Sequence, residues 1–340
     1  MYLGQTTCEI AIADKYKLRG LHEVQIKKSV HQIVQTARLT LPLSVVMKNS
    51  DTVGNVINRT KLIDYIKEGD KISIAFGYDG KHRNEFSGYI KRMNPKQPLE
   101  LELEDEFYLL RRLRLRKSFL KSDVKVVLTW LMNELHNAFG VSYPLYNNIP
   151  DCIIYNMRID NANGVEVLQD IANKYLLVSY LTDLNGVKTL YCGLKYGLRK
   201  QHVKYVLNKN TIRIDDLKFR TVDDTTYKVE VFNQLPNGQL KKFVFGDTKG
   251  EVLKLRVSGE RSEAELKQRA EAEMTTYNTT GYKGKLEALL FPYIEPGCIA
   301  DISDPQFKNR AGSHYVGTVT TIFGVSGGRR IPELDITVSA

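Results

Sequence analysis

Residues 66–103 read IKEGDKISIAFGYDGKHRNEFSGYIKRMNPKQPLELEL, and residues 294–338 read IEPGCIADISDPQFKNRAGSHYVGTVTTIFGVSGGRRIPELDITV. Both stretches begin with Ile-x-x-Gly and continue with a strand of alternating apolar and polar residues. Both then contain a polar loop, a strand with an internal glycine, a proline-containing turn and a final alternating strand. Two interpretations are open: any two three-stranded antiparallel meanders look alike, or the chain carries a duplicated β motif. The shared order and spacing of the elements favour duplication.

Four glycines mark the two stretches. Gly69 and Gly297 end the Ile-x-x-Gly entry, where glycine permits a backbone conformation that other residues resist. Gly88 and Gly317 lie inside strands and indicate a bulge or a sharp bend, as the corners of a β-barrel require. We therefore expect each stretch to belong to an antiparallel β-barrel.

Around these stretches the periodicity of the chain changes twice. Residues 1–117 read as strands and predict a first β-barrel. Residues 118–202 predict a small α/β domain of two helices and a hairpin. Residues 203–340 return to strands and predict a second β-barrel, with an exposed helix at about 260–277. The predicted fold class is α+β, mainly β, with two related antiparallel β-barrels and an intervening small α/β domain.

The helices of the α/β domain are predicted from spacing. Apolar residues recur at helical intervals over residues 122–139, with Ser122 as the expected N-cap and Gly140 as the stop. A second helix is expected over residues 164–176, followed by a hairpin around Asn185-Gly186. Among the later strands, residues 229–232 and 252–257 are the candidates for free edges that pair between subunits.

Composition excludes several classes of protein. Hydrophobic residues make up 42% of the chain and charged residues 26%, as in ordinary folded proteins. No apolar run has the length of roughly 18–20 residues that a membrane span needs, so we expect no membrane insertion. The four cysteines are far apart and the histidines show no metal-binding spacing, so we predict no metal site and no cofactor.

Residues 324–328 match the Gly-x-Ser-x-Gly pattern of hydrolases around Ser326. That pattern needs a strand before it and a helix after it. Here Pro332 and an alternating strand follow, so we interpret the segment as a hairpin loop. No acid–base constellation is visible, and we expect no catalytic residues.

The net charge of +10 includes one basic run, RRLRLRK at residues 111–117. Alternation places Arg112, Arg114 and Arg116 on one face of a strand and the two intervening leucines on the other. Two interpretations of this possible basic surface are open. The first is a solvated strand or a charged surface between subunits. The second is a basic surface that faces passing DNA or an acidic neighbour. It supports an alternative function, a nucleic-acid-binding β-barrel protein that acts through a basic surface.

Four segments together resemble the baseplate hub family of contractile phage tails. This family includes phage late control protein D, the Mu-like tail protein and the hub part of type VI secretion spike proteins. None of the segments is diagnostic alone, but they span nearly the whole chain; they are residues 86–90 with 99–112, 164–177 with 179–191, 260–277 with 281–304, and 313–324.

The resemblance implies a structural, non-enzymatic role as a baseplate hub. It implies a homotrimer in which two barrels from each chain form a six-fold-like ring, which joins the six-fold tail tube to a three-fold spike. The implied partners are a tail spike protein, expected as a separate chain, and tail tube and baseplate proteins, with DNA passing through the lumen without sequence-specific binding. The implied location is the virion tail or baseplate, assembled in the host bacterial cytoplasm.

Overall fold

The computed structural model describes residues 4–46, 59–221, 226–235, 237–247, 249–258, 261–277 and 280–338. The chain divides into two compact units. Unit 1 contains residues 1–28, 34–108 and 320–330, and unit 2 contains residues 29–33, 109–319 and 331–340. Each unit is therefore assembled from segments that are far apart in the sequence. The predicted domain boundaries after residues 117 and 202 stay a prediction.

Unit 1 is an antiparallel β structure. Its strands follow the order β23-β22-β3-β4-β9-β8-β7-β1-β2, in which the β22–β23 hairpin contributes residues 320–330, and β5 and β6 form a separate pair. The elements are β1 Thr6–Ile12, β2 Tyr16–Leu18, β3 Glu23–Ser29, β4 Thr36–Leu41, β5 Ser44–Val46, β6 Arg59–Lys61, the short 3-10 helix η1 Leu62–Asp64, β7 Lys71–Tyr78, β8 Lys81–Asn94 and β9 Leu99–Asp105.

Strand β9 shows how the sequence specifies this sheet. Its leucines at 99, 101 and 103 are fully buried and alternate with glutamates, because successive side chains of a strand point to opposite faces. Between β7 and β8, Asp79 and Gly80 have φ of 52° and 75°. Two consecutive positive φ values are the geometry of a type I′ turn, which Asp-Gly favours. The hairpin and the alternating strand are thus encoded locally.

The interior of unit 1 contains a buried ion pair and a pair of stacked aromatic rings. Arg330 donates from Nη2 to Glu85 Oε1 at 2.8 Å and from Nη1 to Thr321 Oγ1 at 3.0 Å. The side chains of Arg330 and Glu85 are only 3% and 4% exposed. Phe76 of β7 and Phe323 of β22 stack with their ring centroids 4.4 Å apart. Strands that are distant in the strand order therefore share one core.

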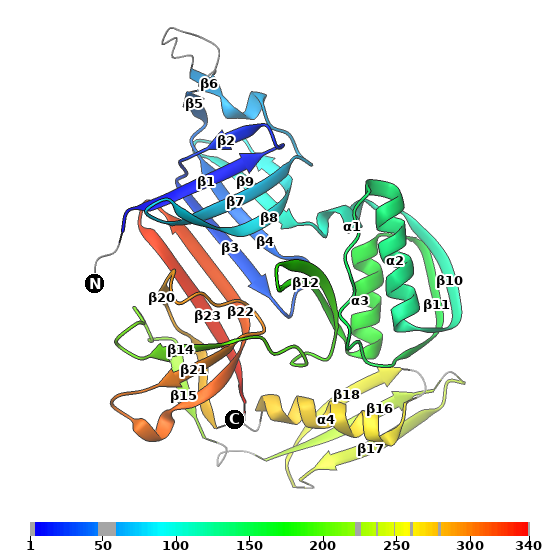
Figure 1. Ribbon diagram of the computed structural model, residues 1–340. Coiled ribbons are helices and arrows are strands. Elements are labelled where there is room, and N and C mark those ends of the chain that lie inside the picture. The colour runs from blue at the N-terminus through cyan, green and yellow to red at the C-terminus, as the bar shows by residue number, and fades with distance from the viewer. Residues whose placement is uncertain are drawn as a thin grey trace. The chain divides into compact units, whose positions relative to one another are not determined.

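The part of unit 2 that follows unit 1 along the chain is an α/β structure. Helices α2 and α3 lie side by side on the β10–β11 ribbon, next to the β12–β13 hairpin (Figure 1). The elements are α1 Tyr108–Arg112, β10 Leu115–Asp123, α2 Val124–Phe139, β11 Ile153–Ala162, α3 Gly164–Tyr175, β12 Val178–Leu184 and β13 Val187–Gly193.

Helix ends follow local capping rules, with one correction to the prediction. The N-cap of α2 is Asp123, whose side chain accepts a hydrogen bond from the Lys125 amide at 2.7 Å; Ser122 instead lies inside β10. The prediction of Ser122 is wrong because the strand extends to the residue before the helix, and an aspartate caps as well as a serine does. Gly140 ends α2 with φ 69°, as predicted.

Helix α3 begins with a capping box. The Asn163 side chain accepts from the Val165 and Glu166 amides, and the Glu166 carboxylate accepts from the Asn163 amide at 2.8 Å. The predicted range of residues 164–176 agrees with the observed helix within one residue, since Leu176 is already left-handed with φ 54°. Both predicted helices of this region are confirmed.

A second antiparallel arrangement lies in the remaining part of unit 2. Its strands follow the order β15-β19-β23-β22, with β21 paired to β22 and β14 parallel to β21. The elements are β14 His202–Val206, β15 Leu217–Arg220, β19 Gly281–Lys285, β20 Ala288–Leu289, β21 Ile299–Ser303, the short 3-10 helix η3 Lys308–Arg310, β22 Gly312–Gly324 and β23 Gly327–Val338. These strands enclose one apolar core that includes Tyr205, Ile294 and Val316.

A three-stranded sheet with one helix completes unit 2, and we call its described residues within 226–277 the α4 lobe. Strands β16 Tyr227–Gln234, β17 Leu240–Gly246 and β18 Glu251–Ser258 pair in the order β17-β16-β18, and α4 Glu263–Tyr277 packs on the sheet (Figure 1). Because β16 is central, residues 229–232 are not an edge, and that prediction is wrong. Residues 252–257 lie in β18, which is an end strand.

Helix α4 is exposed on one face and buried on the other. Glu263, Lys267 and Glu271 are exposed, whereas Leu266 and Ala270 are fully buried with Val229 and Val231 of the sheet. The sequence predicts a more exposed helix because α4 has few large apolar residues. They suffice because the sheet side chains provide most of the apolar volume.

The mainly β class is confirmed, with large antiparallel sheets and an α/β region between the two repeated stretches in sequence. In the described residues the strand order of unit 1 runs from β23 to β2 without a pairing that joins its ends. The two closed barrels therefore stay a prediction. No helix among the described residues is long and apolar enough to cross a membrane.

Candidate functional site

The two repeated stretches form the same three-stranded meander. β7, β8 and β9 pair in chain order in the first, and β21, β22 and β23 do so in the second. Gly69 and Gly297 have φ of 90° and 87°, a conformation that favours glycine. The Gly69 amide donates to the Ile90 carbonyl at 2.7 Å, and the Gly297 amide donates to the Val316 carbonyl at 2.9 Å. In both copies the entry turn is thus tied to the second strand of its meander.

The other two glycines occupy different registers. Gly88 pairs with Ile72 across β7 and β8. Counted from the entry turn, the counterpart of Ile72 in the second meander is Ala300, which pairs with His314 and not with Gly317. The nearly equal spacing of Gly88 and Gly317 therefore does not correspond to equal positions in the strands.

Both of these glycines nonetheless have a close neighbour in the third strand of their meander. A Cβ atom at Gly88 would lie 2.0 Å from the backbone oxygen of Glu104. A Cβ atom at Gly317 would lie 2.1 Å from the Asp335 carboxylate. Each glycine makes room for the third strand of its meander, by a backbone approach in the first copy and by a side-chain approach in the second.

The basic run does not form a single strand. Arg112 ends α1, Arg114 lies in the connection, and Arg116 belongs to β10. All three arginines are exposed and the two intervening leucines are buried, so the arginines lie on the solvent side despite the change of element. Arg116 forms an ion pair with Asp160 at 2.9 Å. The role of this surface stays a prediction.

The Gly-x-Ser-x-Gly segment is a hairpin turn. Strand β22 ends at Gly324, Val325 and Ser326 form the turn, and β23 begins at Gly327 with φ 94°. A strand follows where a nucleophile elbow needs a helix, so the interpretation as a hairpin loop is confirmed. The described part of the chain also brings together no group of three or more His, Cys, Asp or Glu side chains able to hold a metal ion.

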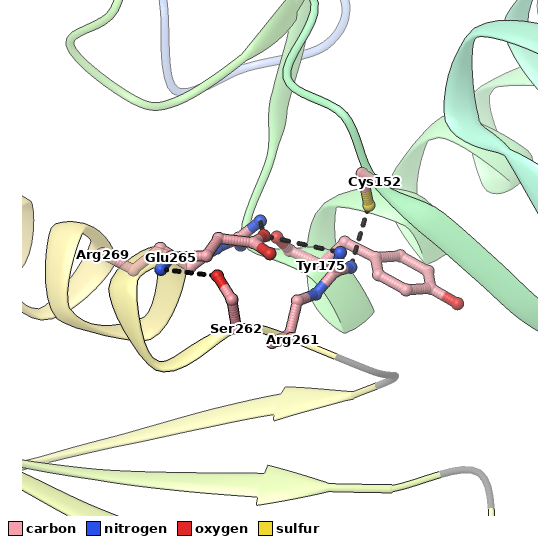
Figure 2. Close-up of polar contacts among 6 residues, drawn as sticks. All are labelled: Cys152, Tyr175, Arg261, Ser262, Glu265 and Arg269. Carbon is pink, nitrogen blue, oxygen red and sulfur yellow. Dashed lines mark hydrogen bonds and ion pairs between the residues drawn. The ribbon is translucent and has the colours of Figure 1, made fainter.

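A buried polar joint connects the α4 lobe to α3 and to Cys152, which precedes β11, and sequence reasoning did not find it. Figure 2 shows two arginines of the lobe pointing toward Cys152 and the end of α3. Arg261 donates to Cys152 Sγ at 2.8 Å, and its guanidinium lies 5.1 Å from the centroid of the Tyr175 ring. Arg269 donates to the backbone carbonyl of Tyr175. The two arginine side chains are 1% and 3% exposed.

One carboxylate serves both arginines of the joint. Glu265 accepts from Arg269 at 2.8 Å and lies 3.4 Å from Arg261 Nη1. Burial, followed by the neighbouring charge of Arg261, lowers the pKa of Arg269, whereas Glu265 opposes this shift. Burial raises the pKa of the Cys152 thiol, and Arg261 opposes this. The joint therefore orients two parts of unit 2, and its thiol is a hydrogen-bond acceptor rather than an activated nucleophile.

The only signal for this joint in the sequence is the i, i+4 spacing of Arg261, Glu265 and Arg269. Such spacing is common on solvent-exposed helices, where it stabilises the helix by a few tenths of a kcal/mol. The spacing does not indicate that Tyr175, which is far away in the sequence, offers its carbonyl to Arg269 and its ring to Arg261. Burial of the arginines is a result of tertiary packing.

Comparison with solved structures shows which fold this is. The chain is similar to a tail protein from Neisseria meningitidis, with a TM-score of 0.64 and 13% identity over 97% of this chain and 96% of that one. It is similar to a 43 kDa tail protein of prophage MuSo2 from Shewanella oneidensis, with a TM-score of 0.62 and 12% identity over 97% and 98% of the two chains.

A third similar structure is an E. coli component of the type VI secretion system, described as structurally similar to the tail proteins gp27 and gp5 of bacteriophage T4. Its TM-score is 0.61 and its identity 10%, over 97% of this chain and 77% of that one. No protein-family model and no curated protein matches the chain by sequence. The resemblance to phage tail and type VI secretion proteins is thus confirmed at the level of the fold.

Proposed function

We propose that the chain is a structural baseplate hub of a contractile phage-like tail. The observation that carries this proposal is the similarity over 97% of the chain to two phage tail proteins, each of which is itself covered almost completely. Similarity in only one or two elements would support the proposal weakly, because proteins of one fold can have many different functions. Here the α/β region and both meanders are included. The role is that of a scaffold, without catalytic residues or cofactor.

In the proposed assembly the hub is a homotrimer. Two related β-barrels in each chain, residues 1–117 and 203–340 with the α/β domain 118–202 between them, would give six similar barrels around a three-fold axis. The paired meanders with their equivalent entry turns support this arrangement. Within unit 1, the Phe76–Phe323 stack joins strands that are distant in the strand order, which supports a first barrel that also takes in residues 320–330. Such a ring matches a six-fold tube to a three-fold spike.

The proposed partners follow from this geometry. A separate tail spike protein binds at the three-fold end, and tail tube and baseplate proteins bind at the six-fold end. The protein is then a virion tail or baseplate component that assembles in the host bacterial cytoplasm, as a phage or prophage product. DNA would pass through the lumen without sequence-specific binding.

The mass of the purified chain in solution tests the hub. We expect a trimer in native mass spectrometry and analytical ultracentrifugation, and rings with two alternating, similar lobes per chain in electron micrographs. Because a trimer dissociates on dilution, the measurement is made over a range up to tens of micromolar. A protein that stays monomeric throughout this range, and remains so when the neighbouring spike protein is added, contradicts the proposal.

The second candidate function is a nucleic-acid-binding protein that acts through the basic surface. It is favoured by the exposure of Arg112, Arg114 and Arg116 together with the net charge of +10. If it holds, the protein binds duplex DNA with an affinity that falls steeply with salt, and replacing the three arginines by Gln lowers the salt slope by about two to three. Replacement of three exposed lysines elsewhere, Lys67, Lys81 and Lys209, is the matched control. Absence of retention on a DNA column at about 0.1 M salt excludes this candidate.

A further inference from the structure

The sheet of the α4 lobe has one open face. Side chains of a strand alternate between its two faces, so the residues that flank Val229 and Val231 point away from α4. Cross-strand pairing identifies their neighbours: Glu230 lies between Val244 of β17 and Lys254 of β18. We call the side of the sheet that faces away from α4 the open face. On that side Lys242, Val244, Val252, Lys254 and Arg256 are exposed.

Charge on the open face is strongly unbalanced. Four cations, Lys228, Lys242, Lys254 and Arg256, share the face with the single carboxylate Glu230. Lys242 and Lys228 already lie 2.8 Å and 3.7 Å from Glu230. Within the described residues neither Lys254 nor Arg256 takes part in an ion pair, and both are exposed. The face therefore carries exposed positive charge along β18 that no ion pair among the described residues neutralises.

The same face exposes aliphatic side chains. Leu240 is 62% exposed, Val244 49% and Val252 43%. Aliphatic groups between cations suit a protein surface, since a single-stranded nucleic acid binds through aromatic stacking platforms. The one aromatic ring of the face, Phe232, is half-buried, and Lys242 lies 5.6 Å from its centroid. Glu230 in the centre of the face would also repel a phosphate.

We propose that the open face binds an acidic, extended segment of another protein. Strand β18 is an end strand of its sheet, but α3 contacts it, so the segment lies across the face and does not pair with this edge. Acidic side chains of the segment contact Lys254 and Arg256, and its apolar side chains contact Val244 and Val252. Interspersed acidic and apolar residues are therefore the expected pattern of the partner. This inference is independent of the proposed hub function.

The test uses the full chain and a labelled peptide with alternating leucine and glutamate, Leu-Glu-Leu-Glu-Leu-Glu-Asp, measured by fluorescence anisotropy. The test variant is Lys254→Glu with Arg256→Glu. The matched control, Lys241→Glu with Lys267→Glu, makes the same change of charge at exposed positions of the same lobe on the α4 side. In a second peptide lysines replace the acidic residues. It tests whether reversing the charge of both the protein and the peptide restores binding. Circular dichroism and thermal melts show that each variant is folded.

We expect the acidic peptide to bind the native chain and to bind the test variant at least about ten-fold more weakly, with the control within about two-fold. The test variant should instead bind the lysine peptide. The proposal is overturned if no binding occurs up to about 1 mM peptide, if the control variant loses binding equally, or if a 20-nucleotide DNA strand competes fully for the same residues.

Discussion

The Glu85–Arg330 pair is the clearest case in which single residues decide stability. Both side chains are almost completely buried, and Arg330 reaches both carboxylate oxygens, at 2.8 Å and 3.2 Å. Removal of one partner leaves an uncompensated charge in the core, which costs about 3–5 kcal/mol. We therefore expect Arg330→Met to lower the free energy of unfolding by about 3 kcal/mol or more in urea titrations.

Two further variants separate the charge from the packing. Arg92→Met removes an exposed arginine from the same unit and should change the free energy of unfolding by less than about 0.5 kcal/mol. The double variant Glu85→Leu with Arg330→Met removes both charges and should recover much of the lost stability. A double variant as unstable as Arg330→Met would show that packing, and not the unpaired charge, causes the loss.

His314 is the residue whose charge state depends on the fold. It is fully buried, its Nε2 accepts from the Tyr282 amide at 2.9 Å, and its Nδ1 lies 3.1 Å from the Gly312 carbonyl, to which it donates as a neutral ring. Burial lowers its pKa below the usual value of 6.5. The unfolded chain therefore binds a proton first as the pH falls, and the contribution of His314 is complete above about pH 6.5 and decreases below it.

The pH dependence of unfolding checks this assignment. We expect the free energy of unfolding to decrease more steeply from about pH 6.5 to 5 in the native chain than in His314→Leu, although that variant is less stable at every pH. His136→Asn removes an exposed histidine and serves as the control with the slope of the native chain. Parallel curves for the native chain and His314→Leu would contradict a neutral, buried His314.

Among the elements, α3 and α4 depend on each other through the arginine joint. Arg269→Met removes the donor to the Tyr175 carbonyl and leaves that buried acceptor without it, at a cost of about 1–3 kcal/mol. We expect faster amide exchange throughout the α4 lobe, measured by mass spectrometry, with α2 unchanged. Lys267→Met, two residues earlier on the exposed face of α4, is the control. Equal exchange in both variants would mean that the apolar core alone holds the lobe.

The elements that sequence reasoning predicts well have strong local signals. Helix α3 has a capping box and an apolar stripe, β9 alternates strictly, and the β7–β8 turn is Asp-Gly. The errors occur where the decision is not local. Ser122 extends a strand because β11 pairs with it, Arg112 joins a helical turn because Leu109 and Leu110 are buried, and β16 is central because a parallel strand, β18, joins its far side.

For the whole molecule, the repeated meander is the feature with the largest functional consequence. The two copies share strand order and an entry turn tied to the second strand, so each chain carries two similar building blocks. The chain has the fold of phage tail proteins over nearly its complete length. In the proposed hub, the arrangement of the two blocks matters more than any single reactive group. A homotrimer would convert this internal pairing into a six-fold-like ring.

Local patterns of the chain alone suffice for the strand and helix periods, the turns, the duplicated meander and the resemblance to tail proteins, since these depend on residues close in sequence. Packing was needed to bring Arg330 to Glu85, to tie Arg261 and Arg269 to Cys152 and Tyr175, and to place Gly88 and Gly317 in different registers. These contacts join residues that are distant in sequence, and the local sequence around one partner does not predict the other. Side chains lose their water and approach each other closely only after the strands and helices have assembled. The repeat can therefore be seen in the sequence, whereas these long-range contacts cannot.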